Sequence, residues 1–152
     1  MDIFVAFEGF TLPAGYIAKE VTVLFPNGEY NHYILKKPEF RHLTTLDEQT
    51  VRYVTRFING LPYVDGHVPY EELGAIIKNL EGYTIYTYSA VAKNLIQDFL
   101  PTTVVINIQE LNHFLPTTLP NPSCFRNHPN YRYCSKAKAI AIRNIIKNEQ
   151  TC

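Results

Sequence analysis

The sequence predicts one α/β domain, residues 1–152, built on a mixed five-stranded sheet with helices on its faces. The first third of the chain reads as three strands joined by turns, which favours an antiparallel start to the sheet. The remainder alternates helical and strand patterns, which favours later strands that run parallel to one another. The chain has 152 residues and is 46% hydrophobic, so it is long enough to bury a sizeable core.

The three N-terminal strands are rich in β-branched and aromatic residues and are separated by turn residues. Gly9 follows the first strand and permits the chain to turn. Pro26-Asn27-Gly28 is a hairpin signal between the second and third strands. The expected strands are Ile3–Phe7, Tyr16–Phe25 and Tyr30–Leu35.

Two helices are expected next. Apolar residues recur at near-helical spacing from Leu46 to Ile58, Thr44 or Thr45 provides an N-cap, and Asn59-Gly60 ends the helix. The second helix opens at Pro69 and continues to Leu80.

Strand and helix patterns then alternate to the end of the chain. The expected elements are a strand Thr84–Tyr88, a helix Ala92–Leu100, a strand Val104–Ile108, a helical segment Gln109–Leu115 and a final helix Lys136–Asn148. The predicted apolar face of the final helix consists of Ala137, Ile140, Ala141 and Ile145. Three strands, two helices and then alternating strands and helices are the plan of the ribonuclease H-like fold, in its exonuclease form.

Composition limits the classes of function. Lysine plus arginine and aspartate plus glutamate both number 14, which argues against duplex nucleic-acid binding through bulk charge. The apolar stretches are too short to cross a membrane, and the N-terminus lacks the pattern of a signal peptide. The chain has three cysteines, which is typical of a reducing compartment, so we expect an intracellular protein of the cytoplasm or nucleus.

A cluster of potential metal ligands precedes the final helix, in a proline-rich loop at about 116–134. Cys124, His128 and Cys134 follow the spacing C-x3-H-x5-C. These residues supply three of the four ligands of a tetrahedral structural zinc site. The alternative is two buried thiols and a surface histidine. Candidates for a fourth ligand are Glu110, His113 and Cys152.

The carboxylates of an exonuclease site are largely missing. The first strand of such enzymes carries Asp-x-Glu, which binds two catalytic metal ions. Here the matching residues are Ala6-Phe7-Glu8, and the later acidic positions fall near Asn94 and Tyr133. One carboxylate cannot hold two divalent ions, so we predict no catalytic residues and regard Glu8 as a vestigial, unpartnered acid.

Over nearly its full length the sequence resembles the MAEL domain of Maelstrom proteins and related exonuclease-derived proteins of arthropods. The resemblance implies a ribonuclease H-like fold that has lost the acidic site and has gained a zinc bound by Glu, Cys, His and Cys. The family's glutamate lies on the second strand in a segment Pro-x-Glu-Ile, where this chain has Lys19-Glu20-Val21. The resemblance therefore implies a structural zinc held by Glu20, Cys124, His128 and Cys134.

The resulting hypothesis is a degenerate exonuclease module of a small-RNA pathway that binds RNA or a protein partner. The alternative implied by the resemblance is a single-strand-specific ribonuclease that acts without the acidic tetrad. Lys136, Lys138 and Arg143 of the final helix are candidates for nucleic-acid contacts, although a solvated helix face has the same composition. Tyr131 and Tyr133 flank the loop and either stack on bases or pack within the fold.

Overall fold

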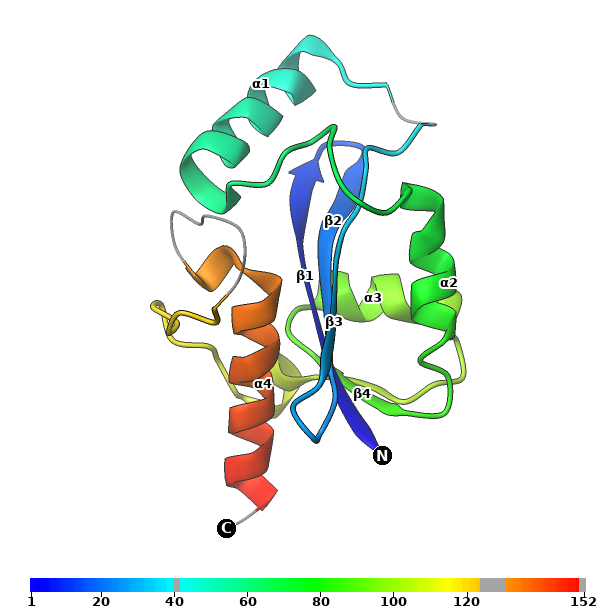
Figure 1. Ribbon diagram of the computed structural model, residues 1–152, viewed down its shortest axis with the longest axis vertical. Coiled ribbons are helices and arrows are strands. Elements are labelled where there is room, and N and C mark those ends of the chain that lie inside the picture. The colour runs from blue at the N-terminus through cyan, green and yellow to red at the C-terminus, as the bar shows by residue number, and fades with distance from the viewer. Residues whose placement is uncertain (40–41, 124–130, 151–152) are drawn as a thin grey trace.

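A computed structural model describes residues 1–39, 42–123 and 131–150. One sheet runs through the molecule in the order β3-β2-β1-β4-β5 (Figure 1). Strand β2 is antiparallel to both neighbours, whereas β4 runs parallel to β1 and β5 runs parallel to β4. The strands are β1 (Asp2–Leu12), β2 (Gly15–Leu24), β3 (Tyr30–Ile34), β4 (Thr84–Thr87) and β5 (Val105–Asn107). The predicted mixed five-stranded sheet is confirmed.

Helices cover both faces of this sheet. Helices α2 (Leu73–Lys78) and α3 (Ala90–Phe99) pack on one face, and α4 (Ser135–Gln150) packs on the other (Figure 1). Alternation along β1 explains both cores, because successive side chains of a strand point to opposite faces. Ile3, Val5 and Phe7 face α2 and α3, whereas Phe4 and Ala6 face α4.

Helix α1 (Thr45–Val54) lies across the end of the sheet at which β1 finishes (Figure 1). Its start is fixed by a capping box: Asp47 N–H donates to Thr44 Oγ1, and Thr44 N–H donates to the Asp47 carboxylate. The helix continues as a π-helical turn, η1 (Thr55–Asn59), which ends at Gly60 with a left-handed φ of 68°. The cap at Thr44 and the end at Asn59-Gly60 are confirmed, but the sequence pattern did not predict the π turn.

The first strand is longer than predicted, because Gly9 lies inside it. The pairing of β1 with β2 shifts register between Glu8 and Gly9, which marks a β-bulge. A Cβ atom on Gly9 would lie 2.0 Å from the backbone oxygen of Ile17. Glycine is therefore required by the close approach of two strands rather than by a turn.

The buried face of α4 also differs from the prediction. Ala139, Ile142 and Ile146 are nearly inaccessible and pack against the sheet. The predicted face borders an apolar groove of about 240 Å³ that Leu119 and several prolines of segment 116–122 also line. The predicted residues on that groove are Ala137, Ile140, Ala141 and Ile145. Helix α4 thus contacts both the sheet and segment 116–122. The prediction assumed one apolar face and so identified only the residues that border the groove.

The remaining short helices are tighter than predicted. The second helix begins with a 3₁₀ turn, η2 (Tyr70–Glu72), before α2. The predicted helical segment 109–115 contains only the 3₁₀ turn η3 (Ile108–Leu111), and another turn, η4 (Tyr131–Tyr133), precedes α4. No helix in the described ranges combines the length and the apolar character needed to cross a lipid bilayer.

Candidate functional site: a polar pocket at the ends of β1 and β4

A pocket of about 470 Å³ opens where the parallel strands β1 and β4 end. Four further parts of the chain enclose it: the start of β2, the end of α1 with η1, the start of α3, and the start of α4. The described residues that line it are Phe7, Glu8, Gly9, Thr11, Tyr16, Val54, Ile58, Asn59, Tyr88, Ser89, Val91, Ala92, Tyr133 and Lys138. In open α/β sheets, the carboxyl ends of parallel strands are the common place for ligands.

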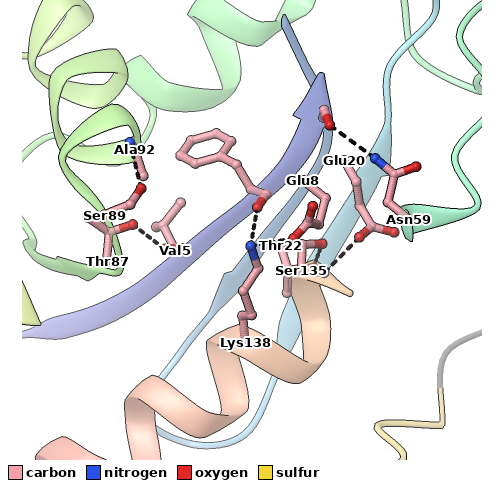
Figure 2. A network of polar contacts seen from close by, with 12 residues as sticks. Val5, Glu8, Glu20, Thr22, Asn59, Thr87, Ser89, Ala92, Ser135 and Lys138 are labelled. Carbon is pink, nitrogen blue, oxygen red and sulfur yellow. Dashed lines mark hydrogen bonds and ion pairs between the residues drawn. The ribbon is translucent and has the colours of Figure 1, made fainter. Parts of the chain in front are cut away.

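Glu8 and Lys138 form an ion pair in this pocket. Lys138 Nζ lies 2.5 Å from Glu8 Oε1 and also donates to the backbone oxygen of Phe7 at 2.8 Å (Figure 2). Both side chains are largely buried, at 17% exposed for Lys138 and 11% for Glu8. The expectation that Glu8 is unpartnered is therefore wrong, because α4 places an ammonium group directly against it.

The other two positions expected for nuclease acids carry none. Asn94 is exposed on α3 and does not line the pocket, where Ser89 and Ala92 stand instead. Ser89 has a φ of 111° and caps α3 by accepting a hydrogen bond from Ala92 N–H at 3.2 Å (Figure 2). Tyr133 lines the pocket at the start of α4. Among the described residues that line the pocket, Glu8 is the only carboxylate.

Asn59 contributes to the site in a way that the sequence analysis missed. Its Nδ2 donates to the backbone oxygen of Gly9 at 3.0 Å (Figure 2). Its Oδ1 accepts from Leu61 N–H at 2.9 Å. The π turn is thereby tied to the bulge in β1. The Asn59 side chain is buried, and buried polar groups are nearly always hydrogen bonded, so both ends of this amide have a partner. An Asn-Gly pair at a helix end predicts only the end of the helix.

Tyr16, on β2, supplies a neutral hydroxyl group to the pocket. Burial raises the pKa of this phenol well above its ordinary value, and the nearby negative charges of Glu8 and Glu20 raise it further. The hydroxyl therefore stays protonated at physiological pH and can donate or accept a hydrogen bond.

Glu20 lies directly opposite Glu8 across the β1–β2 pair and is fully buried. Its Oε1 accepts a hydrogen bond from Ser135 N–H at 2.7 Å, and its Oε2 accepts from His32 Nε2 at 3.0 Å (Figure 2 shows the first of these). Thr22 and Ser135 add a bond between hydroxyl groups at 2.7 Å. Glu20 thus places a carboxylate at the N-terminus of α4, where the helix dipole favours negative charge.

Two of the four predicted zinc ligands, Glu20 and Cys134, lie within the described residues. Cys134 is fully buried and immediately precedes Ser135, whose amide is bonded to Glu20. Cys124 and His128 lie outside the described residues. Within the described ranges, no group of three or more His, Cys, Asp or Glu side chains is arranged to hold a metal ion.

The rival candidates for the fourth ligand lie elsewhere. Glu110 is 57% exposed and forms an ion pair with Lys93 at 3.2 Å. His113 follows η3 and is half-buried, and Cys152 lies outside the described residues. His32 was not predicted as a site residue, although the Pro26-Asn27-Gly28 hairpin sets a register that places it diagonally across from Glu20.

The three predicted nucleic-acid contacts do not share one surface. Lys138 lines the pocket, whereas Lys136 is 9% exposed and its Nζ lies 4.1 Å from the centre of the Tyr30 ring. Arg143 lies beside Gly28 in the β2–β3 turn. Lys136 and Arg143 are seven positions apart on α4 and therefore face the same side, away from Lys138.

No protein-family model and no curated protein matches this sequence. The resemblance to Maelstrom-type domains accordingly rests on the residues and the order of elements described above.

Proposed function

We propose that this chain is a ribonuclease H-like module without two-metal nuclease activity, which binds single-stranded RNA in the pocket at the ends of β1 and β4. The strand order β3-β2-β1-β4-β5, with β2 alone antiparallel, supports the fold assignment. A helix packed on the opposite face from α2 and α3 closes the chain, as expected for the exonuclease plan.

The Glu8–Lys138 ion pair carries the proposal. Two-metal catalysis needs several carboxylates that hold two divalent ions a few ångströms apart. Here one carboxylate lines the described pocket, and a lysine ammonium 2.5 Å away neutralises it. A divalent cation would have to displace Lys138 and would also meet the repulsion of its charge. The pair therefore favours a binding site over a metal-dependent nuclease site.

The lining of the pocket supports a base as the ligand. Tyr16, Tyr88 and Tyr133 contribute rings, and bases of single strands stack on aromatic side chains. Tyr16 and Ser89 add hydroxyl groups that can bond to base edges. The volume of about 470 Å³ falls within the range of pockets that enclose small organic ligands, so a splayed base fits better than a duplex.

A structural zinc is the second part of the proposal. Glu20 and Cys134 would hold it together with Cys124 and His128, and the closeness of Glu20 to the residue after Cys134 supports this set. Bound zinc would supply folding free energy by tying the loop to β2 and α4. The zinc content of the purified protein is the direct measurement.

Binding of a fluorescein-labelled oligo-uridine, followed by anisotropy, tests the pocket. Tyr133→Ala should weaken binding about tenfold, because a stacked base is worth about 1–3 kcal/mol. Tyr133→Phe keeps the ring and should bind like wild type. Phe114→Ala removes a ring that is 65% exposed and outside the pocket lining, so it serves as the control. Equal affinities for Tyr133→Ala and wild type would place the RNA elsewhere.

A further inference from the structure

We infer that Tyr53 and Phe57, with Arg56 beside them, form a second base-stacking surface that extends the pocket along the RNA strand. This surface is called the aromatic platform below. The inference rests on the proposed function, since it names where the nucleotide next to the pocket would bind.

The platform consists of two exposed aromatic rings that lie against each other at a tilt. Tyr53 is 59% exposed and Phe57 is 57% exposed, although both are large apolar side chains. Their ring centroids lie 5.1 Å apart at an interplanar angle of 46°, as expected for side chains four positions apart on a helix. The Arg56 guanidinium lies 5.1 Å from the centre of the Phe57 ring. A paired aromatic surface with a cation against it is a suitable face for a base.

The platform lies on the same helical segment as one wall of the pocket. Val54, Ile58 and Asn59 line the pocket, and Tyr53 and Phe57 are the residues that precede Val54 and Ile58. Successive positions on a helix are rotated by about 100°, so the two rings lie about a quarter turn around the helix from the pocket-lining Val54 and Ile58. The bond from Asn59 Nδ2 to Gly9 O fixes this wall against β1. An RNA strand with one base in the pocket would therefore reach the platform by following this adjacent side of the helix.

Charge on this helix favours a nucleic acid over a protein partner. Arg52 and Arg56 follow the acidic first turn of α1, and both flank the exposed rings in sequence. Guanidinium groups bind phosphate and stack on bases, which matches an RNA backbone with unstacked bases. The chain as a whole is neutral, and Asp47 and Glu48 balance the two arginines along this helix, so the expected attraction is confined to the guanidinium groups beside the rings.

The test uses the intact chain and the same labelled oligo-uridine. Tyr53→Ala and Phe57→Ala should each weaken binding about tenfold, the effect expected for one lost stacked base. Arg56→Gln should reduce the slope of log affinity against log salt by about 0.7, which corresponds to one phosphate contact on a single strand. Leu46→Ala is the matched control, because Leu46 is 61% exposed on the same helix but has no ring. Its affinity should equal that of wild type.

A spectroscopic reading checks stacking itself. The chain has no tryptophan, so the variant Phe57→Trp carries a single indole reporter. Oligo-uridine should quench its fluorescence with the same dissociation constant that anisotropy gives. If the wild-type protein binds RNA and both alanine variants bind it with the same affinity, the platform is overturned and the pocket proposal stays intact. The same conclusion follows if Phe57→Trp binds RNA without quenching of its fluorescence. Failure of the wild-type protein to bind RNA would overturn both. Loss of binding in Leu46→Ala as well would indicate a general apolar docking face and also overturn the platform.

Discussion

Glu20→Ala should lower the free energy of unfolding by about 4 kcal/mol, because it leaves two buried hydrogen-bond donors unsatisfied and each costs about 1–3 kcal/mol. The Glu20 side chain is fully buried and bonds to both Ser135 N–H and His32 Nε2. Truncation would leave these donors without that acceptor in a site closed to water, and would remove the anion at the N-terminus of α4. Urea unfolding at constant pH measures the loss.

The matched control is Glu110→Ala, which removes a carboxylate from an exposed ion pair with Lys93. Exposed pairs contribute about 0–1 kcal/mol, so this variant should unfold nearly as wild type does. Glu20→Gln keeps an oxygen for Ser135 N–H but loses the charge. If Glu20 is a zinc ligand, Glu20→Gln and Cys134→Ser should both lose a metal that wild type holds at about one zinc per chain. A Glu20→Ala variant as stable as Glu110→Ala would contradict the role of Glu20 in holding α4.

Gly9→Ala should destabilise the fold by about 3 kcal/mol, at the upper end of the usual cost of overpacking. The added Cβ would lie 2.0 Å from Ile17 O, 2.9 Å from Ile17 C and 3.0 Å from Ala18 Cα. All three atoms belong to the backbone of β2, so no side-chain rotation can relieve the contact. The two strands would have to separate at the bulge, next to Glu8 and the Asn59 bond to Gly9 O.

Gly82→Ala separates this steric effect from backbone strain. Gly82 has a φ of 91°, and a Cβ there would meet no atom within 4 Å. Only the conformational penalty applies, at about 1–2 kcal/mol. Thermal and urea unfolding of both variants should therefore rank Gly9→Ala as the less stable. The reverse order would show that the bulge at Gly9 is not formed as described.

Local signals in the sequence predicted the fold well. Turn residues and β-branched runs predicted the first three strands, and the cap at Thr44 and the stop at Gly60 bounded the first helical segment. The order of elements predicted the five-stranded sheet. The length of β1 was missed because a glycine within a strand looks like a turn until the partner strand is known. The π turn has no such local signal.

The site was predicted only in part. The sequence indicated Glu8 and Tyr133, which both line the pocket, whereas the zinc set that includes Glu20 and Cys134 stays a prediction. The sequence could not show that Lys138 reaches Glu8, since the pairing depends on how α4 crosses the sheet. Asn59 was missed for the same reason, because its partner Gly9 is fifty residues away. Side chains that meet through packing leave no pattern in one sequence.

The most direct test of the central claim is the integrity of a bound RNA with and without a divalent metal. End-labelled single-stranded RNA is incubated with wild-type protein in added Mg²⁺ or Mn²⁺ and in buffer without them, and is then analysed for both retention and length. Omitting the ions is preferable to a chelator, because a chelator would also remove zinc. Tyr133→Ala, purified in parallel, reports any contaminating nuclease. The Glu8–Lys138 pair predicts RNA that is retained and stays full length under both conditions. Shortening that requires Mg²⁺ or Mn²⁺ and disappears in Glu8→Gln would contradict the claim, and shortening that needs no added metal would favour the metal-independent ribonuclease.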